Sequence, residues 1–113
     1  MHELSIARSI VELAEEQAVL HGSSVVEELE LEIGYLSGVE IHTLEFALDS
    51  AVKGSRLADA RIVRHYIAGE GQCSDCETVF PMDRLFSPCP FCGSFLVKIT
   101  KGKELRIKSI VVK

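Results

Sequence analysis

The sequence of 113 residues lacks a long apolar run, an internal repeat and a low-complexity linker. No stretch approaches the roughly 20 apolar residues that a membrane-spanning helix needs. The first residues carry neither a basic leader nor an apolar segment ending in small residues, which a secretory signal would have. These absences argue against a membrane or secreted protein, so we expect one small, soluble, cytoplasmic unit with room for a subdomain.

Basic residues are scarce in the first half of the chain. Residues 1–50 contain eleven acidic residues and a single basic one, Arg8, whereas residues 51–113 contain six acidic and eleven basic residues. The net charge of −5 therefore conceals an acidic half and a basic half. An acidic first half repels phosphates, which disfavours nucleic-acid binding there. We interpret these carboxylates mainly as a solvated surface, with attraction of a basic partner or a cation as the alternative.

Cysteine is also sparse, and all four cysteines fall in two Cys-x-x-Cys pairs. Cys73 is paired with Cys76 and Cys89 with Cys92, with twelve residues between the pairs. Tetrahedral zinc takes four thiolates at about 2.3 Å, and a two-residue gap lets one tight turn present two sulfurs to the same ion. Because four cysteine ligands leave no open coordination position, the spacing predicts a closed, structural zinc site.

Two other interpretations of the cysteines compete with zinc. Paired disulfides suit secreted proteins, but the chain shows no secretory features and cytosolic thiols stay reduced. A thioredoxin-like redox motif needs one Cys-x-x-Cys pair on a βαβ unit, not two pairs around a short loop. Zinc is therefore favoured, and Gly93, directly after the second pair, can take the positive φ that lets the chain bend back.

Apolar periodicity predicts two helices. Residues 4–21 form the first, whose predicted core-facing positions are Ile6, Ile10, Leu13, Gln17 and Leu20, with Ala14 beside them. Ser37 and Glu40 match a capping box, which predicts that a second helix begins there and continues to about residue 53. The core-facing positions predicted for the second helix are Ile41, Leu44, Leu48 and Ala51.

Three strands are predicted outside the cysteine-rich segment. They cover residues 24–34, where Leu29, Leu31 and Ile33 alternate with glutamates, residues 58–68, and residues 104–112, with Leu105, Ile107 and Val111 on one side. Short hairpin strands are predicted after each cysteine pair, at 78–80 and 95–97.

This order of elements predicts an α+β fold: a small sheet of about three strands with two helices, plus an inserted zinc-ribbon-like module. The predicted domains are an α/β domain formed by residues 1–68 with 98–113, and a zinc-binding domain formed by residues 69–97.

The first three residues, Met1-His2-Glu3, carry a second metal-binding pattern. The N-terminal amine and the amide and imidazole nitrogens of His2 can form fused chelate rings around one ion, with the Glu3 amide as a fourth donor. Nitrogen donors in a plane suit Ni(II) or Cu(II). By itself the pattern is weak, because a histidine near a terminus is usually just solvated. No partner at ligand spacing accompanies the other histidines, His21, His42 and His65.

Several segments of the chain together point to one family. In order they are Met1-His2-Glu3-Leu4-Ser5, Ile10-Val11, Glu32-Ile33-Gly34, Leu36-Ser37-Gly38-Val39, Cys73-x-x-Cys76, Phe80 and Cys89-Pro90-x-Cys92-Gly93-Ser94. The chain closely resembles the HypA/HybF family of hydrogenase nickel-incorporation proteins over essentially its whole length. The resemblance is specific because the start, the middle segment and the cysteine module agree in order and spacing.

The resemblance implies a metallochaperone and not an enzyme. It implies that His2 is the side-chain ligand of one nickel ion in the domain 1–68 with 98–113, with the Met1 amine and the His2 and Glu3 amides as backbone donors. It implies that one structural zinc is held by Cys73, Cys76, Cys89 and Cys92. Some relatives place a histidine after each cysteine pair, where this chain has Glu77 and Gly93, so a role of such histidines does not transfer.

The partners that the resemblance implies are a GTPase of the HypB type and the large subunit of [NiFe]-hydrogenase, and in some relatives urease maturation proteins. Neither nucleic acid nor a membrane is expected. The alternative is a zinc-ribbon module that binds protein or nucleic acid without a nickel function. The acidic first half disfavours it, whereas the basic second half leaves it open. A catalytic metalloenzyme ranks third, because four cysteines close the zinc site and no other cluster stands out.

Overall fold

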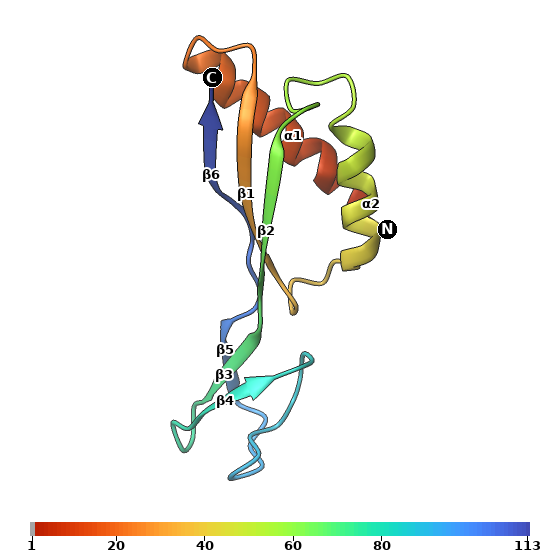
Figure 1. Cartoon of the computed structure of the whole chain (residues 1–113). Helices are drawn as coiled ribbons and strands as arrows, with labels where there is room; N and C mark the ends of the chain where they lie inside the picture. The colour runs from red at the N-terminus through yellow and green to blue at the C-terminus, as the bar shows by residue number, and fades with distance from the viewer. Residues whose placement is uncertain (1) are drawn as a thin grey trace. The chain divides into compact units, whose positions relative to one another are not determined.

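The computed structural model describes residues 2–113, which divide into two compact units (Figure 1). The first unit consists of residues 2–31, 39–65 and 106–113, and the second of residues 32–38 and 66–105. No helix within residues 2–113 is long and apolar enough to cross a membrane.

The predicted α+β class is confirmed. The elements are α1 (Glu3–Leu20), β1 (Val26–Gly34), α2 (Ile41–Ala51), β2 (Arg61–Ile67), β3 (Gly69–Cys73), β4 (Val79–Met82), β5 (Val97–Lys101) and β6 (Leu105–Val112). They form two three-stranded sheets, with the strand orders β2-β1-β6 and β4-β3-β5. The helices α1 and α2 cover one face of the first sheet (Figure 1).

Helix α1 confirms the first predicted helix and buries the predicted Ile10 and Ala14, but its buried face is shifted from the predicted one. Its buried apolar residues are Ala7, Ile10, Val11, Ala14 and Ala18. Leu13 and Leu20, which were predicted to face the core, are 52% and 76% exposed, so that part of the prediction was wrong. The prediction weighted large side chains, whereas three of the five buried apolar residues of α1, a helix that packs against α2, are alanines.

Helix α2 begins at a different cap from the predicted one. Glu40 is itself the N-cap, and its carboxylate accepts hydrogen bonds from the backbone N–H groups of His42 at 3.2 Å and Thr43 at 3.1 Å. Ser37 therefore does not cap the helix, and the capping-box prediction was wrong. A carboxylate suits this place because the N-terminal end of a helix carries partial positive charge. The helix ends at Ala51, two residues before the predicted end.

The apolar alternation of β1 is confirmed. Leu29, Leu31 and Ile33 are at most 1% exposed, and on α2 the predicted core residues Leu44 and Leu48 are fully buried. β1 is the central strand of a sheet that the helices cover on one face (Figure 1), and one covered and one open face produce this alternation.

The two strands that flank β1 were predicted less well. β2 begins three residues later than predicted, at Arg61, and six of its seven residues are half-buried. In β6, Ile107 and Ile110 are half-buried, whereas Val111 is 44% exposed, so its predicted inward position was wrong. The alternation fails because two successive residues, Lys108 and Ser109, are both exposed.

The second unit has a small core around its sheet. β3 pairs antiparallel with both β4 and β5, so that Gly71 lies opposite Phe80 on one side and Ile99 on the other. A Cβ atom at Gly71 would overlap the side chain of Met82, so the absence of a side chain there makes room for the core. The buried residues that form this core are Leu36, Cys73, Phe80, Met82 and Cys89.

Candidate metal sites

The two Cys-x-x-Cys pairs lie in turns of the same geometry. The carbonyl of Cys73 accepts a hydrogen bond from the N–H of Glu77 at 2.9 Å, and the carbonyl of Cys89 accepts one from the N–H of Gly93 at 2.9 Å. Glu77 and Gly93 both have positive φ, of 64° and 77°. The expectation for Gly93 is confirmed. The same conformation at Glu77 escaped sequence reasoning because a glutamate gives no signal for it.

The four cysteine sulfurs converge on one point. The Sγ atoms of Cys73 and Cys92 are 3.5 Å apart, and those of Cys76 and Cys89 are 3.6 Å apart. All four sulfurs lie within 4.8 Å of one another, and none forms a disulfide. Sulfurs at about 2.3 Å from a tetrahedral zinc ion are about 3.8 Å apart. The number, type and separation of these donors therefore fit one zinc ion.

Two thiols of the cluster have pKa values that are shifted in opposite directions. Cys76 Sγ lies 3.2 Å from the hydroxyl of Thr78, and this contact lowers the pKa of Cys76 to about 6. At Cys92 the backbone of Ser94 lowers the pKa, but the neighbouring sulfur of Cys73 and burial outweigh it and raise the pKa to about 12. Adjacent thiolates repel one another, so a divalent cation is needed to hold all four in the ionised form.

The cysteines also belong to the core of their unit. Cys73 and Cys89 are 0% and 2% exposed, whereas Cys76 and Cys92 are exposed. Each turn thus contributes one buried and one exposed sulfur. A metal held by all four would link the core of the unit to its surface turns.

The second predicted site lies at the start of α1. The Met1 amine, one of its expected donors, lies outside the described residues. The side chain of His2 is exposed and makes no capping hydrogen bond, while its carbonyl accepts the N–H of Ile6 at 2.9 Å. The imidazole of His2 is therefore not engaged by the helix, whereas the backbone N–H of Glu3 interacts with the carboxylate of its own side chain.

Glu3 has a role that sequence reasoning missed. Its side chain is 6% exposed, and its Oε2 accepts the backbone N–H of Glu40 at 3.0 Å. This hydrogen bond is the main reason why the pKa of Glu3 falls to about 2. It joins the start of α1 to the start of α2. The partner lies 37 residues away in sequence, so only an acidic residue in the first helical turn hinted at it.

The remaining histidines lie in other elements or at their ends. His21 Nδ1 lies 2.8 Å from the carbonyl oxygen of Gln17, and His65 Nε2 lies 3.6 Å from a carboxylate oxygen of Glu30. His42 is exposed on the first turn of α2. Among the residues that the structure describes, the four cysteines form the only group of three or more such side chains close enough to hold a metal.

Comparisons with known proteins agree on one family. A family model described as hydrogenase/urease nickel incorporation, metallochaperone, hypA matches residues 1–112. The hydrogenase maturation factor HypA of Parabacteroides distasonis is 81% identical over 113 residues, which cover 100% of this chain and 98% of that protein. The factor of the same name from Geobacter sulfurreducens is 39% identical over 112 residues, with 99% of both chains covered.

A solved structure shows the same fold. The solution structure of the Ni metallochaperone HypA from Helicobacter pylori matches with a TM-score of 0.68 and 30% sequence identity, covering 99% of this chain and 97% of that one. The sequence, the fold and the cysteine module thus agree, and the chain belongs to the HypA family of hydrogenase and urease nickel-incorporation metallochaperones.

Proposed function

We propose that this chain binds one Ni(II) ion at its N-terminus and delivers it for the maturation of a [NiFe]-hydrogenase. The match of the family model over residues 1–112 carries this proposal. In the proposal, nickel binds to the domain formed by residues 1–68 with 98–113. The domain formed by residues 69–97 holds one structural zinc through Cys73, Cys76, Cys89 and Cys92.

The proposed nickel donors are nitrogen atoms of the first three residues of the chain. They are the Met1 amine, the amide and imidazole nitrogens of His2, and the Glu3 amide. A dication at the positive end of a helix is unfavourable, but the loss of two amide protons on binding offsets its two charges. The amine has a reference pKa of about 7.7–8.0, so protons compete with nickel increasingly as the pH falls below about 8. The site can therefore bind a metal at cytosolic pH and release it on acidification.

The environment of the chain start suits transfer of a metal between proteins. The imidazole of His2 is exposed, so an acceptor can approach it and displace the ligands one at a time. The buried carboxylate of Glu3, bonded to the N–H of Glu40, holds the next residue in place. An exposed imidazole is thus attached to a fixed helix end. This arrangement combines access with a defined position, which a metal donor needs.

Nickel titration into three forms of the full chain tests the proposal. We expect wild type, made with an authentic free Met1 amine, to bind one nickel equivalent beyond zinc. His2→Ala, which lacks the imidazole, and a form extended before Met1, which lacks the free amine at that position, should both lose tight binding. His42→Ala removes an exposed histidine of α2 and should bind as wild type does. Tight binding by the extended form would refute the terminal site.

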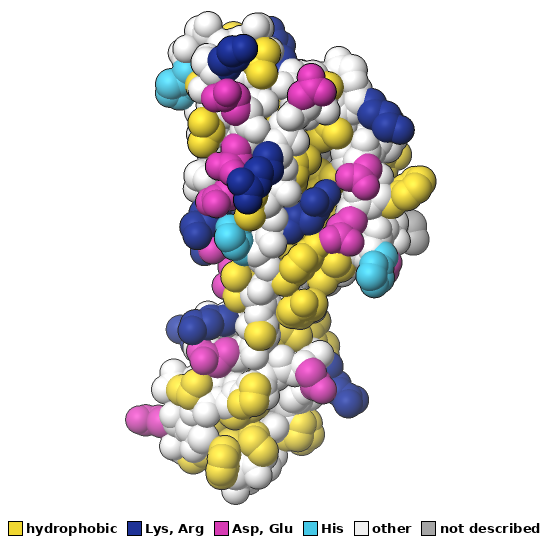
Figure 2. Space-filling view, viewed as in Figure 1, with side chains coloured by type: hydrophobic (Ala, Val, Ile, Leu, Met, Phe, Trp, Pro, Cys, Tyr) yellow, Lys and Arg dark blue, Asp and Glu magenta, His cyan; other side chains and the backbone are white. Residues whose placement is uncertain are grey.

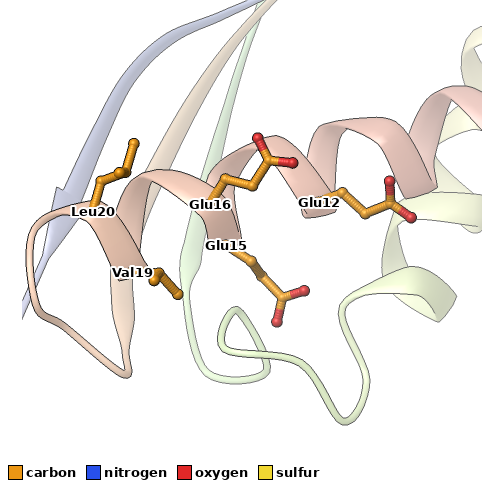
Figure 3. Close-up of a pocket in the computed structure, with 5 residues that line it drawn as sticks. All are labelled: Glu12, Glu15, Glu16, Val19 and Leu20. Carbon is orange, nitrogen blue, oxygen red and sulfur yellow. The ribbon is translucent and has the colours of Figure 1, made fainter.

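We also propose that one face of α1 binds the GTPase partner. Glu12, Glu15, Glu16, Val19 and Leu20 line a hollow of about 520 Å³ on this helix (Figure 3). Val19 and Leu20 are 56% and 76% exposed, so apolar and acidic side chains share the surface. A basic, partly apolar segment of a HypB-type GTPase would complement it. The other proposed partners are the hydrogenase large subunit and, where a urease is served, its maturation proteins.

Charge reversal tests this surface. Glu15 is left unchanged because its Oε2 accepts the backbone N–H of Arg56 at 3.0 Å. We expect Glu12→Lys with Glu16→Lys to slow association with the GTPase and to remove the dependence of the association rate on salt. Asp59→Lys changes the same net charge per substitution on an exposed loop and serves as the control. If the association rate changed neither with the charge reversals nor with ionic strength, the GTPase would bind to another surface of the chain.

A further inference from the structure

The second unit exposes more large apolar side chains than it buries. Apart from cysteines, its buried hydrophobic residues are Ile33, Leu36, Phe80 and Met82. The exposed ones are Tyr35 at 58%, Val79 at 52%, Leu85 at 39%, Phe86 at 90%, Phe91 at 74%, Phe95 at 74% and Leu96 at 63%. In Figure 2 hydrophobic side chains cover much of the visible surface of this unit. Large exposed apolar patches mark interaction sites, so this surface is a candidate binding site for another molecule.

Phe86 is the most unusual residue of this surface. Its φ is +62°, a conformation that a bulky side chain rarely adopts. It is also 90% exposed, so packing within the chain does not explain why a phenylalanine stands there. The turn that carries it is held by a hydrogen bond from Ser87 Oγ to the carbonyl of Arg84 at 3.1 Å. Such strained positions cluster at ligand contacts and active sites.

A hollow of about 220 Å³ lies beside Phe86. Leu85, Phe86 and Phe95 contribute to its wall, and Lys103 is the only charged residue that lines it. Sites for small molecules usually measure about 300–1,000 Å³, so this volume is better suited to a single anchoring side chain. Lys103 forms no ion pair with any residue in the described part of the chain. An anion on the occupant would complement it.

We propose that the hollow beside Phe86 binds an acidic, amphipathic segment of a partner protein. The segment inserts one large apolar side chain against Phe86 and Phe95 and places a carboxylate near the ammonium of Lys103. Exposed aromatic residues are the usual anchors of such interfaces, where they fill or line pockets at low entropic cost. A nucleic acid fits less well, because Lys103 is a single cation, whereas a phosphate backbone is bound through several basic side chains.

The hollow depends on the cysteine turns for its shape. Phe95 follows Ser94, whose carbonyl accepts the N–H of Cys89 at 2.8 Å. The next residue, Leu96, is held from both sides: its carbonyl accepts the N–H of Ser74 at 2.8 Å, and its own N–H donates to Ser94 Oγ at 3.1 Å. One wall of the hollow is therefore attached to both cysteine turns. Binding of the segment should consequently require the zinc-loaded protein.

Selection from a library of short random peptides tests the proposal with the full, zinc-loaded chain. We expect enrichment of peptides that combine Asp or Glu with a large apolar residue. The strongest of them, made synthetically, then serves as the probe. Phe86→Ala and Phe95→Ala should each weaken its binding about tenfold or more. Phe46→Ala should not, since Phe46 is 78% exposed but lies on α2.

Two further variants separate binding from folding. Phe86→Gly removes the anchor and relieves the positive φ, so it should keep zinc and thermal stability while binding is lost. Lys103→Glu should weaken the acidic probe more than Lys98→Glu, because Lys98 does not line the hollow. The proposal is overturned if the selection enriches no such peptides, or if the probe binds Phe86→Ala and Phe95→Ala as tightly as wild type. It is also overturned by a single-stranded oligonucleotide that binds the hollow more tightly than any selected peptide.

Discussion

Each of the two units of the chain is stabilised internally in a different way. The first buries a set of large aliphatic side chains, including Leu29, Leu31, Leu44, Leu48 and Leu57, each fully or almost fully excluded from water. Full burial of one such side chain stabilises a fold by about 1.5–3 kcal/mol. The second buries only six hydrophobic residues, and two of them are cysteines. The comparison teaches that the first unit can rely on packing, and we infer that the second depends more strongly on a metal bound by its cysteines.

The same contrast extends to the chemistry of the two metal sites. The cysteine site is closed, sulfur-based and partly buried, which suits a zinc ion that stays in place. The proposed nickel site is nitrogen-based and includes an exposed histidine, which suits an ion that leaves. A carrier needs both properties at once. In the proposed function, the permanent ion and the transported ion are bound by different units.

The largest effect is expected from removal of a zinc ligand. Cys73→Ser should release the zinc and unfold the second unit, because structural zinc contributes on the order of 10 kcal/mol in small zinc-binding domains. The first unit should keep its helical circular dichroism. Zinc content and thermal melting measure this, with Ser74→Ala as the neighbouring control. A full zinc equivalent and an unchanged melting curve in Cys73→Ser would contradict the comparison.

Truncation of the aliphatic core should destabilise the first unit and leave zinc binding by the second unit unchanged. Leu44→Ala leaves a cavity in the first unit and should lower the free energy of unfolding by about 2–5 kcal/mol, with zinc retained. Leu13→Ala, at the exposed leucine of α1, should change it by no more than about 0.5 kcal/mol. Denaturant titration measures both. Equal effects of the two substitutions would show that the buried face of α1 is wrongly placed.

Glu3 should give a smaller, pH-dependent effect in the first unit. Its pKa is lowered to about 2 in the folded chain, against about 4.3 in an unfolded one. The ionised carboxylate therefore stabilises the fold above about pH 4.3, and this contribution is lost as the pH falls toward 2. Glu3→Gln should lower stability at pH 7, and Glu12→Gln should not. A Glu3 carboxyl that titrates near pH 4.3 by NMR would exclude the bond to Glu40.

The smallest effect concerns the two cysteine turns. Glu77 holds a positive φ that glycine adopts without strain, so Glu77→Gly should stabilise the second unit by up to about 1 kcal/mol. Gly93→Ala, at the matching position, should destabilise it by a similar amount. No atom lies within 4 Å of a Cβ added at Gly93, so this effect is purely conformational. Loss of stability in Glu77→Gly would indicate that its side chain has another role.

Sequence patterns predicted what depends on local repetition. The alternation in β1 identified Leu29, Leu31 and Ile33, and cysteine spacing identified a cluster that the fold does bring together. Sequence patterns failed where the core position is occupied by a small residue, or the N-cap by a residue type that is uncommon there. The alanines of α1 carry little hydrophobic signal, and Glu40 is an uncommon N-cap. The bond from Glu3 to Glu40 links residues far apart in sequence, so no local pattern reveals it.

Metal content by native mass spectrometry tests the separation of the two metals most directly. Wild type, with a free Met1 amine, is expected to carry one zinc and to gain one nickel when nickel is added. His2→Ala should keep the zinc and gain no nickel, whereas Cys73→Ser should lose the zinc and still gain nickel. Loss of nickel binding in Cys73→Ser, or nickel retained in His2→Ala, would contradict the assignment of the two metals to separate units.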